Sequence, residues 1–193
     1  MKDSIIDFFN YIQPIINACA GFIKTDGYMM YKNGVLIMMD SEEMYCSIII
    51  LPIVHDISIT AKINTFMSLK TDEDRCNYLS LLYFTGWNIK EMKLQTYFLR
   101  YSDLSKYKCV YNEPNCYNIN GFDEAVGKST IDNVKIVNDY RFYIIPVSRA
   151  ITPLTKQDRL SIYIYNDTIT NILHYSMYKK KFNIVVNIYC NII

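Results

Sequence analysis

The sequence has few of the residues that carry most enzyme chemistry. Only two histidines, His55 and His174, occur among 193 residues, and neither has triad or metal-binding partners close to it in the sequence. The six cysteines are scattered, with no CxxC pair and no cysteine–histidine cluster. We therefore expect a protein that is not an enzyme and that has no catalytic residues, no metal and no cofactor.

A secretory leader and a membrane span are also missing from the pattern. Met1–Cys19 does not read as a signal peptide, so we interpret the cysteines as reduced, mostly buried thiols. The longest apolar stretches, Ile48–Val54 and Phe182–Ile193, fall short of the ~20 residues that a membrane helix needs. We expect a nuclear or cytoplasmic protein that is not secreted and has no membrane partner.

An excess of charge of either sign is absent. Twenty Lys and Arg against 19 Asp and Glu leave a net charge of +1, which gives no global attraction to nucleic acid or to an anionic membrane. This net charge does not exclude a basic patch on one face of the protein. With 51% hydrophobic and 20% charged residues the chain is typical of a globular protein. Isoleucine, asparagine, tyrosine and lysine dominate it, which is typical of AT-rich genomes such as those of many large DNA viruses.

Two kinds of motif suggest chemistry but do not complete it. Val126–Thr130 (VGKST) looks like the end of a phosphate-binding loop, but the position that needs the first glycine is occupied by Phe122. An ordinary surface loop is the favoured interpretation. The acidic segments Asp40–Glu43 and Asp72–Asp74 have no histidine close to them in the sequence. We interpret them as solvated turns rather than acid/base or Mg²⁺ sites.

The most informative stretch that is present runs from Asn33 to Pro52. Asn33-Gly34 supplies the positive φ angles of a tight hairpin turn between two apolar runs. Phe22–Tyr31 is the expected strand before the turn, and Val35–Met39 and Met44–Leu51 are the expected strands after it. Three strands joined by short polar connections form a meander, whose apolar face needs a cover.

An amphipathic helix before the meander is the expected cover. Ser4–Cys19 has apolar residues at helical spacing, and Ser4 is a suitable N-cap. We expect its stripe to pack on the sheet through Phe8, Ile12 and Ile16. Pro14 should kink this helix, or split it near Asn10, because proline has no N–H group to donate to the backbone carbonyl of Asn10.

The rest of the chain alternates short elements with polar breaks. The expected elements of the first half are a strand at Ile57–Thr60, a helix at Ala61–Leu69, a turn at Thr71–Asp74, an apolar run at Tyr78–Phe84, and a mixed run at Asn88–Tyr101 that fits a strand but leaves a helix open. The expected strands of the second half are Val134–Val137, Leu160–Tyr165, Ile169–Tyr178 and Phe182–Tyr189, with a basic corner at Lys179–Lys181. The second half thus repeats the layout of the first. We predict an α+β fold of two domains, 1–101 and 131–193, joined by a connector at 102–130 and each built of an antiparallel sheet covered by short helices.

The first half also resembles a known family. In the DNA sliding clamp family, which includes proliferating cell nuclear antigen, a helix leads into a strand, a glycine-containing turn, a strand ending in Met-Asp-Ser and a further apolar strand. Here the matching residues are Gly34, Met39–Ser41 and Met44–Leu51. Ile151–Leu154 and the run RLSIYIYND that begins at Arg159 resemble the closing helix and strands of the second domain. The resemblance implies a divergent, shortened viral member with two clamp-like domains.

This resemblance implies a non-enzymatic factor that tethers a polymerase or transcription protein to DNA, either for replication processivity or for viral late transcription. Such a factor touches the phosphates of double-stranded DNA without reading its sequence, and homo-oligomer formation is left open. The residues that would face the duplex are Lys62, Lys70, Arg149 and Lys156.

In the family, partner proteins insert a short peptide into an apolar pocket beside the strand that follows Met-Asp-Ser. Carried over to this sequence, the pocket would use Met39, Asp40, Met44, Cys46, Ile169 and Tyr189. One alternative from another class stays open: a viral interaction module that binds a host or viral protein and does not encircle DNA.

Overall fold

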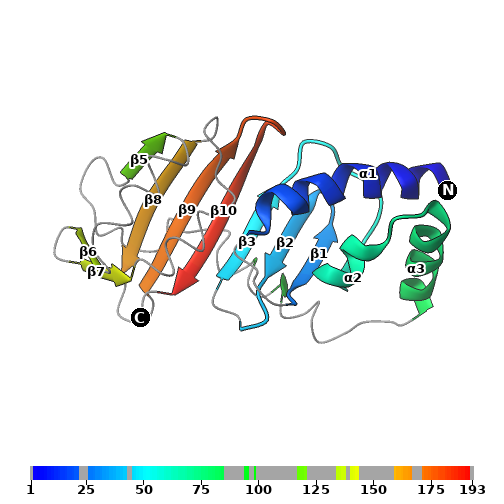
Figure 1. Ribbon diagram of the computed structural model, residues 1–193, viewed down its shortest axis with the longest axis horizontal. Helices are drawn as coiled ribbons and strands as arrows, with labels where there is room; N and C mark the ends of the chain where they lie inside the picture. The colour runs from blue at the N-terminus through cyan, green and yellow to red at the C-terminus, as the bar shows by residue number, and fades with distance from the viewer. Residues whose placement is uncertain are drawn as a thin grey trace.

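The computed structural model describes residues 2–21, 26–42, 45–84, 94–95, 98, 117–120, 134–137, 140–143, 159–166 and 171–191. It has an α+β architecture in which helices lie against an antiparallel sheet (Figure 1). The sheet order is β4-β1-β2-β3-β10-β9, and β8 and β5 continue it beyond β9. Its strands are β1 (Tyr28–Lys32), β2 (Val35–Met39), β3 (Tyr45–Ile50), β4 (Ile59–Lys62), β5 (Tyr117–Asn120), β8 (Arg159–Asn166), β9 (Asn171–Lys179) and β10 (Ile184–Asn191).

The hairpin between β1 and β2 confirms the turn predicted at Asn33-Gly34. Both residues have positive φ angles, 51° at Asn33 and 78° at Gly34, as a two-residue hairpin turn requires. Glycine is needed at position 34 for a second reason. A Cβ atom added there would lie only 2.8 Å from Cγ2 of Val54, in the loop that follows β3. The meander β1-β2-β3 is therefore fixed locally by its turn residues.

Helix α1 (Lys2–Cys19) covers one face of the meander, as predicted (Figure 1). Phe8, Ile12 and Ile16 are almost completely buried and share one core cluster with apolar residues of β1, β2 and β3. The expected split near Asn10 is wrong, because α1 is a single helix with Pro14 inside it. Asn10 and Pro14 are both exposed, so water can reach the Asn10 carbonyl that Pro14 cannot bond.

Two further helices complete this layer. The predicted strand and helix after β3 are both present. The strand, β4, lies two residues closer to the C-terminus than predicted, and the helix, α2 (Ile63–Ser68), is shorter than predicted at both ends. The acidic segment expected to be a turn instead begins α3 (Asp72–Phe84). Thr71 caps it, since its Oγ1 accepts a hydrogen bond of 3.1 Å from the Asp74 amide and donates one of 2.6 Å to the Asp74 carboxylate. The hydrogen bond from the Asp74 amide to the Thr71 hydroxyl is the N-cap contact that starts a helix.

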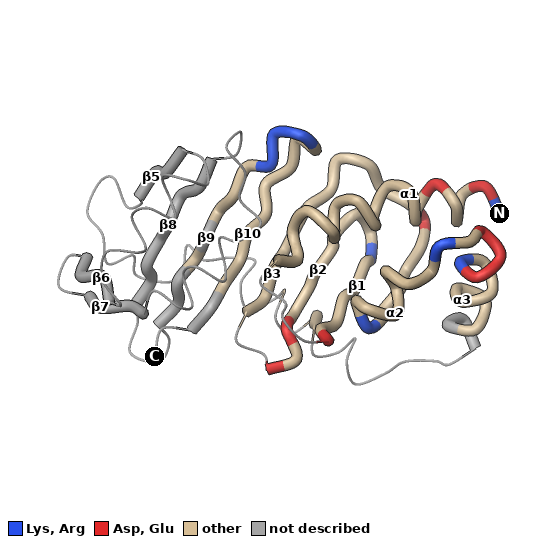
Figure 2. The backbone as a smooth tube through the Cα atoms, in the orientation of Figure 1, with Lys and Arg blue, Asp and Glu red and all other residues tan. Residues whose placement is uncertain are grey.

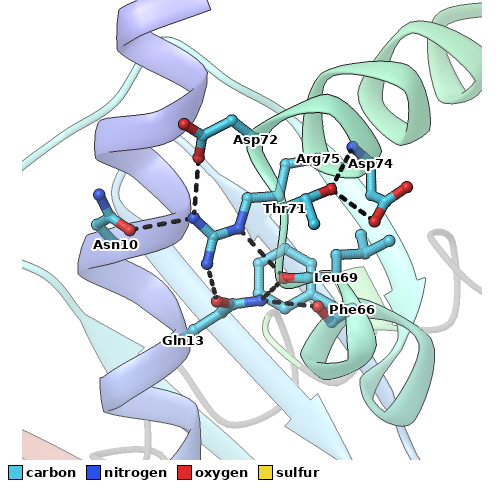
Figure 3. Close-up of polar contacts among 8 residues, drawn as sticks. All are labelled: Asn10, Gln13, Phe66, Leu69, Thr71, Asp72, Asp74 and Arg75. Atoms are coloured by element: carbon cyan, nitrogen blue, oxygen red, sulfur yellow. Dashed lines mark hydrogen bonds and ion pairs between the residues drawn. The ribbon is translucent and has the colours of Figure 1, made fainter.

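A buried arginine ties α3 to α1 and to the end of α2 (Figure 3). The Arg75 guanidinium donates to the carbonyl of Leu69 at 3.1 Å, to Oδ1 of Asn10 at 3.2 Å and to Oε1 of Gln13 at 2.8 Å. It also lies over the Phe9 ring, 5.5 Å from the centroid. Because Arg75 is largely buried, these hydrogen bonds are what makes its position tolerable.

Strand β10 joins the first and second halves of the chain within the sheet. Val186 pairs with Ile49 and Tyr189 with Cys46, so β10 lies directly beside β3. The expected strands at Val134–Val137, Leu160–Tyr165, Ile169–Tyr178 and Phe182–Tyr189 correspond to β6 (Val134–Val137), β8, β9 and β10. Strand β6 pairs with β7 (Tyr140–Tyr143) in a separate two-stranded sheet. The division into two clamp-like domains stays a prediction, and the connector at 102–130 lies mostly outside the described residues.

The face of the sheet opposite α1, called here the far face, carries a second core cluster. Its buried members are Met30, Ile37, Met39, Cys46, Ile48, Leu94 and Tyr189. Leu94 and Phe98 lie in the run at Asn88–Tyr101, and both are helical in the structure. Of the two interpretations left open for that run, these residues follow the helix. They pack against the far face, so the sheet is apolar on both sides near β1 and β2.

Candidate binding surface on the far face

Three of the residues expected to bind a partner lie in one row across the sheet. Cys46 is paired in register with Met39 on one side and with Tyr189 on the other. All three belong to the cluster on the far face. Met39 is 1% exposed, Cys46 2% and Tyr189 6%. In this structure they form part of a core rather than an open pocket. The other expected residues in strand-flanking positions, Met44 and Ile169, lie outside the described residues.

Asp40 closes the turn between β2 and β3. Its side chain is completely buried, and its Oδ1 accepts a hydrogen bond of 2.9 Å from the backbone amide of Tyr45. The Asp40 amide in turn donates to the Tyr45 carbonyl at 3.4 Å. Burial, with the Asp40 charge as a second cause, raises the pKa of the Cys46 thiol. Cys46 therefore stays a protonated, unreactive thiol at neutral pH.

The row continues from Tyr189 to His174 on β9. These two residues are paired in register, and their rings are stacked with centroids 4.5 Å apart. Nε2 of His174 lies 2.8 Å from Oδ1 of Asn187. Burial lowers the pKa of His174 to about 4, although the Asn187 hydrogen bond acts in the opposite direction. The imidazole is therefore neutral at pH 7 and serves as a packed core residue.

The residues expected to contact DNA are only partly described. Lys62, the last residue of β4, forms an exposed ion pair of 3.5 Å with Asp26, and Lys70 is exposed between α2 and α3. Arg149 and Lys156 lie outside the described residues. Figure 2 shows acidic residues near the N-terminus of α1 and at the start of α3. These belong to the first turns of the two helices and are Asp3, Asp72, Glu73 and Asp74.

An apolar pocket opens on the far face beside the β1–β2 hairpin. The cavity has a volume of about 300 Å³, and its wall is mostly apolar. Strands β1 and β2, the turn between them and two helical residues of the later run line it. The lining residues are Met30, Lys32, Asn33, Val35, Ile37, Gln95 and Phe98. Lys32 and Asn33 are exposed, so the pocket has an apolar floor and a polar rim. Such a site fits an apolar side chain whose neighbours are polar.

An exposed row of side chains leads away from this pocket across the sheet. Lys32 pairs with Val35, Val35 pairs with Ile50, and Val185 pairs with Tyr178. Ile50 and Val185 come together because the strands are antiparallel: Ile50 follows Ile49, and Val185 precedes its partner Val186. Ile50 is 70% exposed and Val185 44% exposed. The exposed row is defined by Lys32, Val35, Ile50, Val185 and Tyr178, of which Val35 and Tyr178 are half-buried. It crosses β1, β2, β3, β10 and β9 in that order.

The sequence pattern did not predict this row, although it holds one signal for it. Strand β3 ends in three consecutive isoleucines, so its two faces are equally apolar where a one-sided sheet would alternate. Such a run places an isoleucine on the far face, but it does not tell whether another element covers that residue. Only the pairing of β3 with β10 shows that Ile50 and Val185 lie side by side.

Charge is distributed unevenly between the two ends of these strands. The end that carries the exposed row includes Lys32 and the turn between β9 and β10, where Lys180 and Lys181 are exposed. Figure 2 shows this turn as a basic segment at the top of the sheet, with acidic segments at the lower end of the meander. The acidic end contains Asp40 and Glu42. The apolar part of the exposed row therefore lies between lysines.

The described residues contain neither a candidate metal site nor a helix that could span a membrane. Within the described ranges, no three side chains of His, Cys, Asp or Glu come together in a way that could hold a metal ion. The helices of those ranges are too short or too polar to cross a membrane. The loop Gly127–Ser129 lies outside them.

Comparison with known proteins adds no family to these observations. No model of a known protein family matches the chain, and no curated protein matches it significantly.

Proposed function

We propose that this chain is a non-enzymatic binding protein that holds a segment of a partner protein on the far face of its sheet. The observation that carries the proposal is the apolar pocket beside the β1–β2 hairpin together with the exposed row that leads from it. Exposed apolar surface next to a preformed pocket is typical of protein-binding sites. The pocket receives one apolar side chain of the partner, and Ile50 and Val185 contact the residues that follow.

The rigidity of the surrounding sheet supports this assignment. The residues beneath and beside the surface are buried: Met30 and Ile37 in the pocket wall, and Ile48 next to Ile50 on β3. A binding surface built on paired strands loses little conformational entropy when a partner binds. The helices on the opposite face hold the strands in place through the core around Phe8 and Ile12.

A clamp-like tether on DNA is the more specific form of the proposal. Its support is the order of elements, since α1 is followed by β1, the Gly34 turn, β2 ending at Met39 and then β3. In this form the partner is a polymerase or transcription protein, and Lys62 and Lys70 contact DNA phosphates. The acidic first turns of α1 and α3 do not contribute to DNA binding. The binding surface on the far face is common to both forms.

Selection from a random peptide display library tests the proposal. The full chain is used as bait, and enriched peptides are counter-selected on the variant Val35→Glu, which places a charge at the pocket wall. We expect enriched peptides that share an apolar residue and that bind the wild-type chain at least about tenfold more tightly than Val35→Glu.

The control variant is Leu81→Glu, which changes a residue of α3 that is 65% exposed and lies outside the far-face cluster. It should retain wild-type affinity for the same peptides. Circular dichroism of both variants checks that the fold is kept. Failure to enrich any peptide, or equal binding to wild type and Val35→Glu, would overturn the proposal.

A further inference from the structure

We infer that the partner segment has an apolar centre flanked on both sides by carboxylates, and that it lies along the exposed row. This inference rests on the proposed function and specifies the chemistry of the partner. The two observations behind it are the apolar middle of the row, Val35, Ile50 and Val185, and the lysines at both of its ends.

The length of the row sets the size of the segment. Five neighbouring strands about 4.8 Å apart span roughly 19 Å from β1 to β9. An extended chain rises about 3.3 Å per residue, so about six residues cover that distance. The central residues of such a segment contact Ile50, 70% exposed, and Val185, 44% exposed. Burying these two side chains gives the segment its apolar requirement.

The ends of the row supply the charge requirement. Lys32 lies at the β1 end, on the rim of the pocket. At the other end, Tyr178 is followed by the β9–β10 turn with Lys180 and Lys181. The Lys181 ammonium lies 5.5 Å from the centre of the Phe182 ring, and the Tyr178 hydroxyl donates to Oδ1 of Asn183 at 2.8 Å. The latter hydrogen bond braces the turn.

The geometry selects against a basic partner at the same place. Among the residues of the row and of the β9–β10 turn, Lys32, Lys180 and Lys181 are exposed and no acid is present. A segment with cationic flanks would therefore meet like charges at both ends of the row. An acidic partner gains attraction at both ends, and this attraction falls as salt is added. Partner choice is thus set by flank charge, and apolar contact sets the position.

The position of the row separates this inference from the site implied by the clamp resemblance. That site centres on Met39, Cys46 and Tyr189, which are buried. On β2, Val35 lies four residues before Met39, and on β3, Ile50 lies four residues after Cys46. At about 3.4 Å per residue the two rows are roughly 14 Å apart along the strands.

Fluorescence anisotropy with a pair of designed peptides tests the inference on the full chain. Both peptides have about eight residues and the centre Leu-Phe-Leu-Val, labelled with fluorescein. One has two glutamates on each side of the centre, and the other has two lysines on each side. We expect the glutamate-flanked peptide to bind about tenfold more tightly at low salt, and the difference to shrink in high salt.

Variants assign the binding to the row. Ile50→Ser with Val185→Ser should weaken binding of the glutamate-flanked peptide at least about tenfold, because two apolar contacts are lost. Lys32→Glu with Lys181→Glu should reverse the preference between the two peptides. Leu81→Ser and Lys2→Glu are matched controls at exposed positions away from the row, and both should bind like wild type.

The outcomes distinguish this inference from the proposed function. Equal binding of both peptides to wild type, or an unchanged preference in the lysine variant, would overturn the inference of an acidic partner. The proposed function would then still be tested separately, by the selection of library peptides that bind the far face. Analytical ultracentrifugation of the wild-type chain and of the double variant Ile50→Ser with Val185→Ser tests whether a second copy of the chain occupies the row instead. A dimer that the double variant abolishes would assign the row to a second copy of the chain and overturn the inference.

Discussion

Nη2 of Arg75 donates a hydrogen bond of 2.8 Å to Oε1 of Gln13, and this contact joins α3 to α1 across 62 residues of sequence. Gln13 in turn donates from its Nε2 to the carbonyls of Phe66 and Leu69, at 3.0 and 2.9 Å. The amide of Gln13 therefore links α1 to α2 and to the connection that follows it. Because the arrangement uses the planar fork of a guanidinium, an ammonium cannot replace it.

Arg75→Lys should lower the free energy of unfolding by about 2 kcal/mol, since it removes several hydrogen bonds from a charged donor. Urea denaturation measures this loss. The control is Asp72→Asn, which removes only the ion pair of 3.6 Å between Arg75 and a carboxylate that is half exposed. That change should cost less than about 1 kcal/mol. A loss as large in the control as in Arg75→Lys would contradict the assignment.

Pro14→Ala should stabilise the protein. A proline inside a helix costs about 3 kcal/mol relative to alanine, and about 1 kcal/mol of this is offset because proline also restricts the unfolded chain. Pro14 is exposed in the middle of α1, so alanine can donate to the Asn10 carbonyl without disturbing the core. We expect a gain of about 2 kcal/mol in urea denaturation. Asn17→Ala, another exposed position of α1, gives the gain due to helix propensity alone, about 0.6 kcal/mol.

The local parts of this fold could be predicted because their causes are local. The hairpin follows from Asn33-Gly34, and the cover of the sheet follows from the apolar stripe of α1. Helix α3 was missed although its start has a local signal. Thr71 and Asp74 have the spacing of a capping box, but the acidic residues between them were interpreted as a turn.

The candidate site depends on contacts that the sequence does not show. The resemblance to sliding clamps brought Met39, Cys46 and Tyr189 into one group, and the structure places them in one row. Their burial could not be predicted, because it depends on Leu94 from a distant segment. The exposed row needs the register between β3 and β10, which joins residues about 135 positions apart. A pairing over that distance leaves no periodic signal in either strand.

Stability should fall when the pH is lowered from about 6.5 to 4, because His174 resists protonation in the folded state. Its folded pKa of about 4 lies below the unfolded value of 6.5. Between these values the unfolded chain binds a proton that the folded chain does not, so acid favours unfolding. The full difference corresponds to about 3 kcal/mol.

Urea denaturation at several pH values measures this dependence, with His174→Gln as the comparison. Glutamine keeps a hydrogen-bonding group near Asn187 but does not titrate. The variant should lose much of the slope between pH 6.5 and 4. An unchanged slope in His174→Gln would show that other groups cause the dependence.

The clamp-like form of the proposal makes a quantitative prediction for DNA. Each phosphate that a lysine neutralises releases condensed counterions, so affinity for duplex DNA should fall steeply with salt and be independent of base sequence. Lys62→Ala with Lys70→Ala should reduce the slope of log affinity against log salt by about two, since each phosphate contact contributes about 0.9. Lys180→Ala with Lys181→Ala changes two exposed lysines at the other end of the sheet's strands and should leave the slope unchanged. Titration of labelled duplexes of two unrelated sequences, at several salt concentrations, measures both variants.

The ion pair between Lys62 and Asp26 adds a third comparison, because Asp26→Asn frees the lysine and should strengthen DNA binding slightly. Absence of binding at low salt, or a slope indifferent to Lys62→Ala with Lys70→Ala, would remove DNA from the proposal and leave a binding protein that acts through its far face alone.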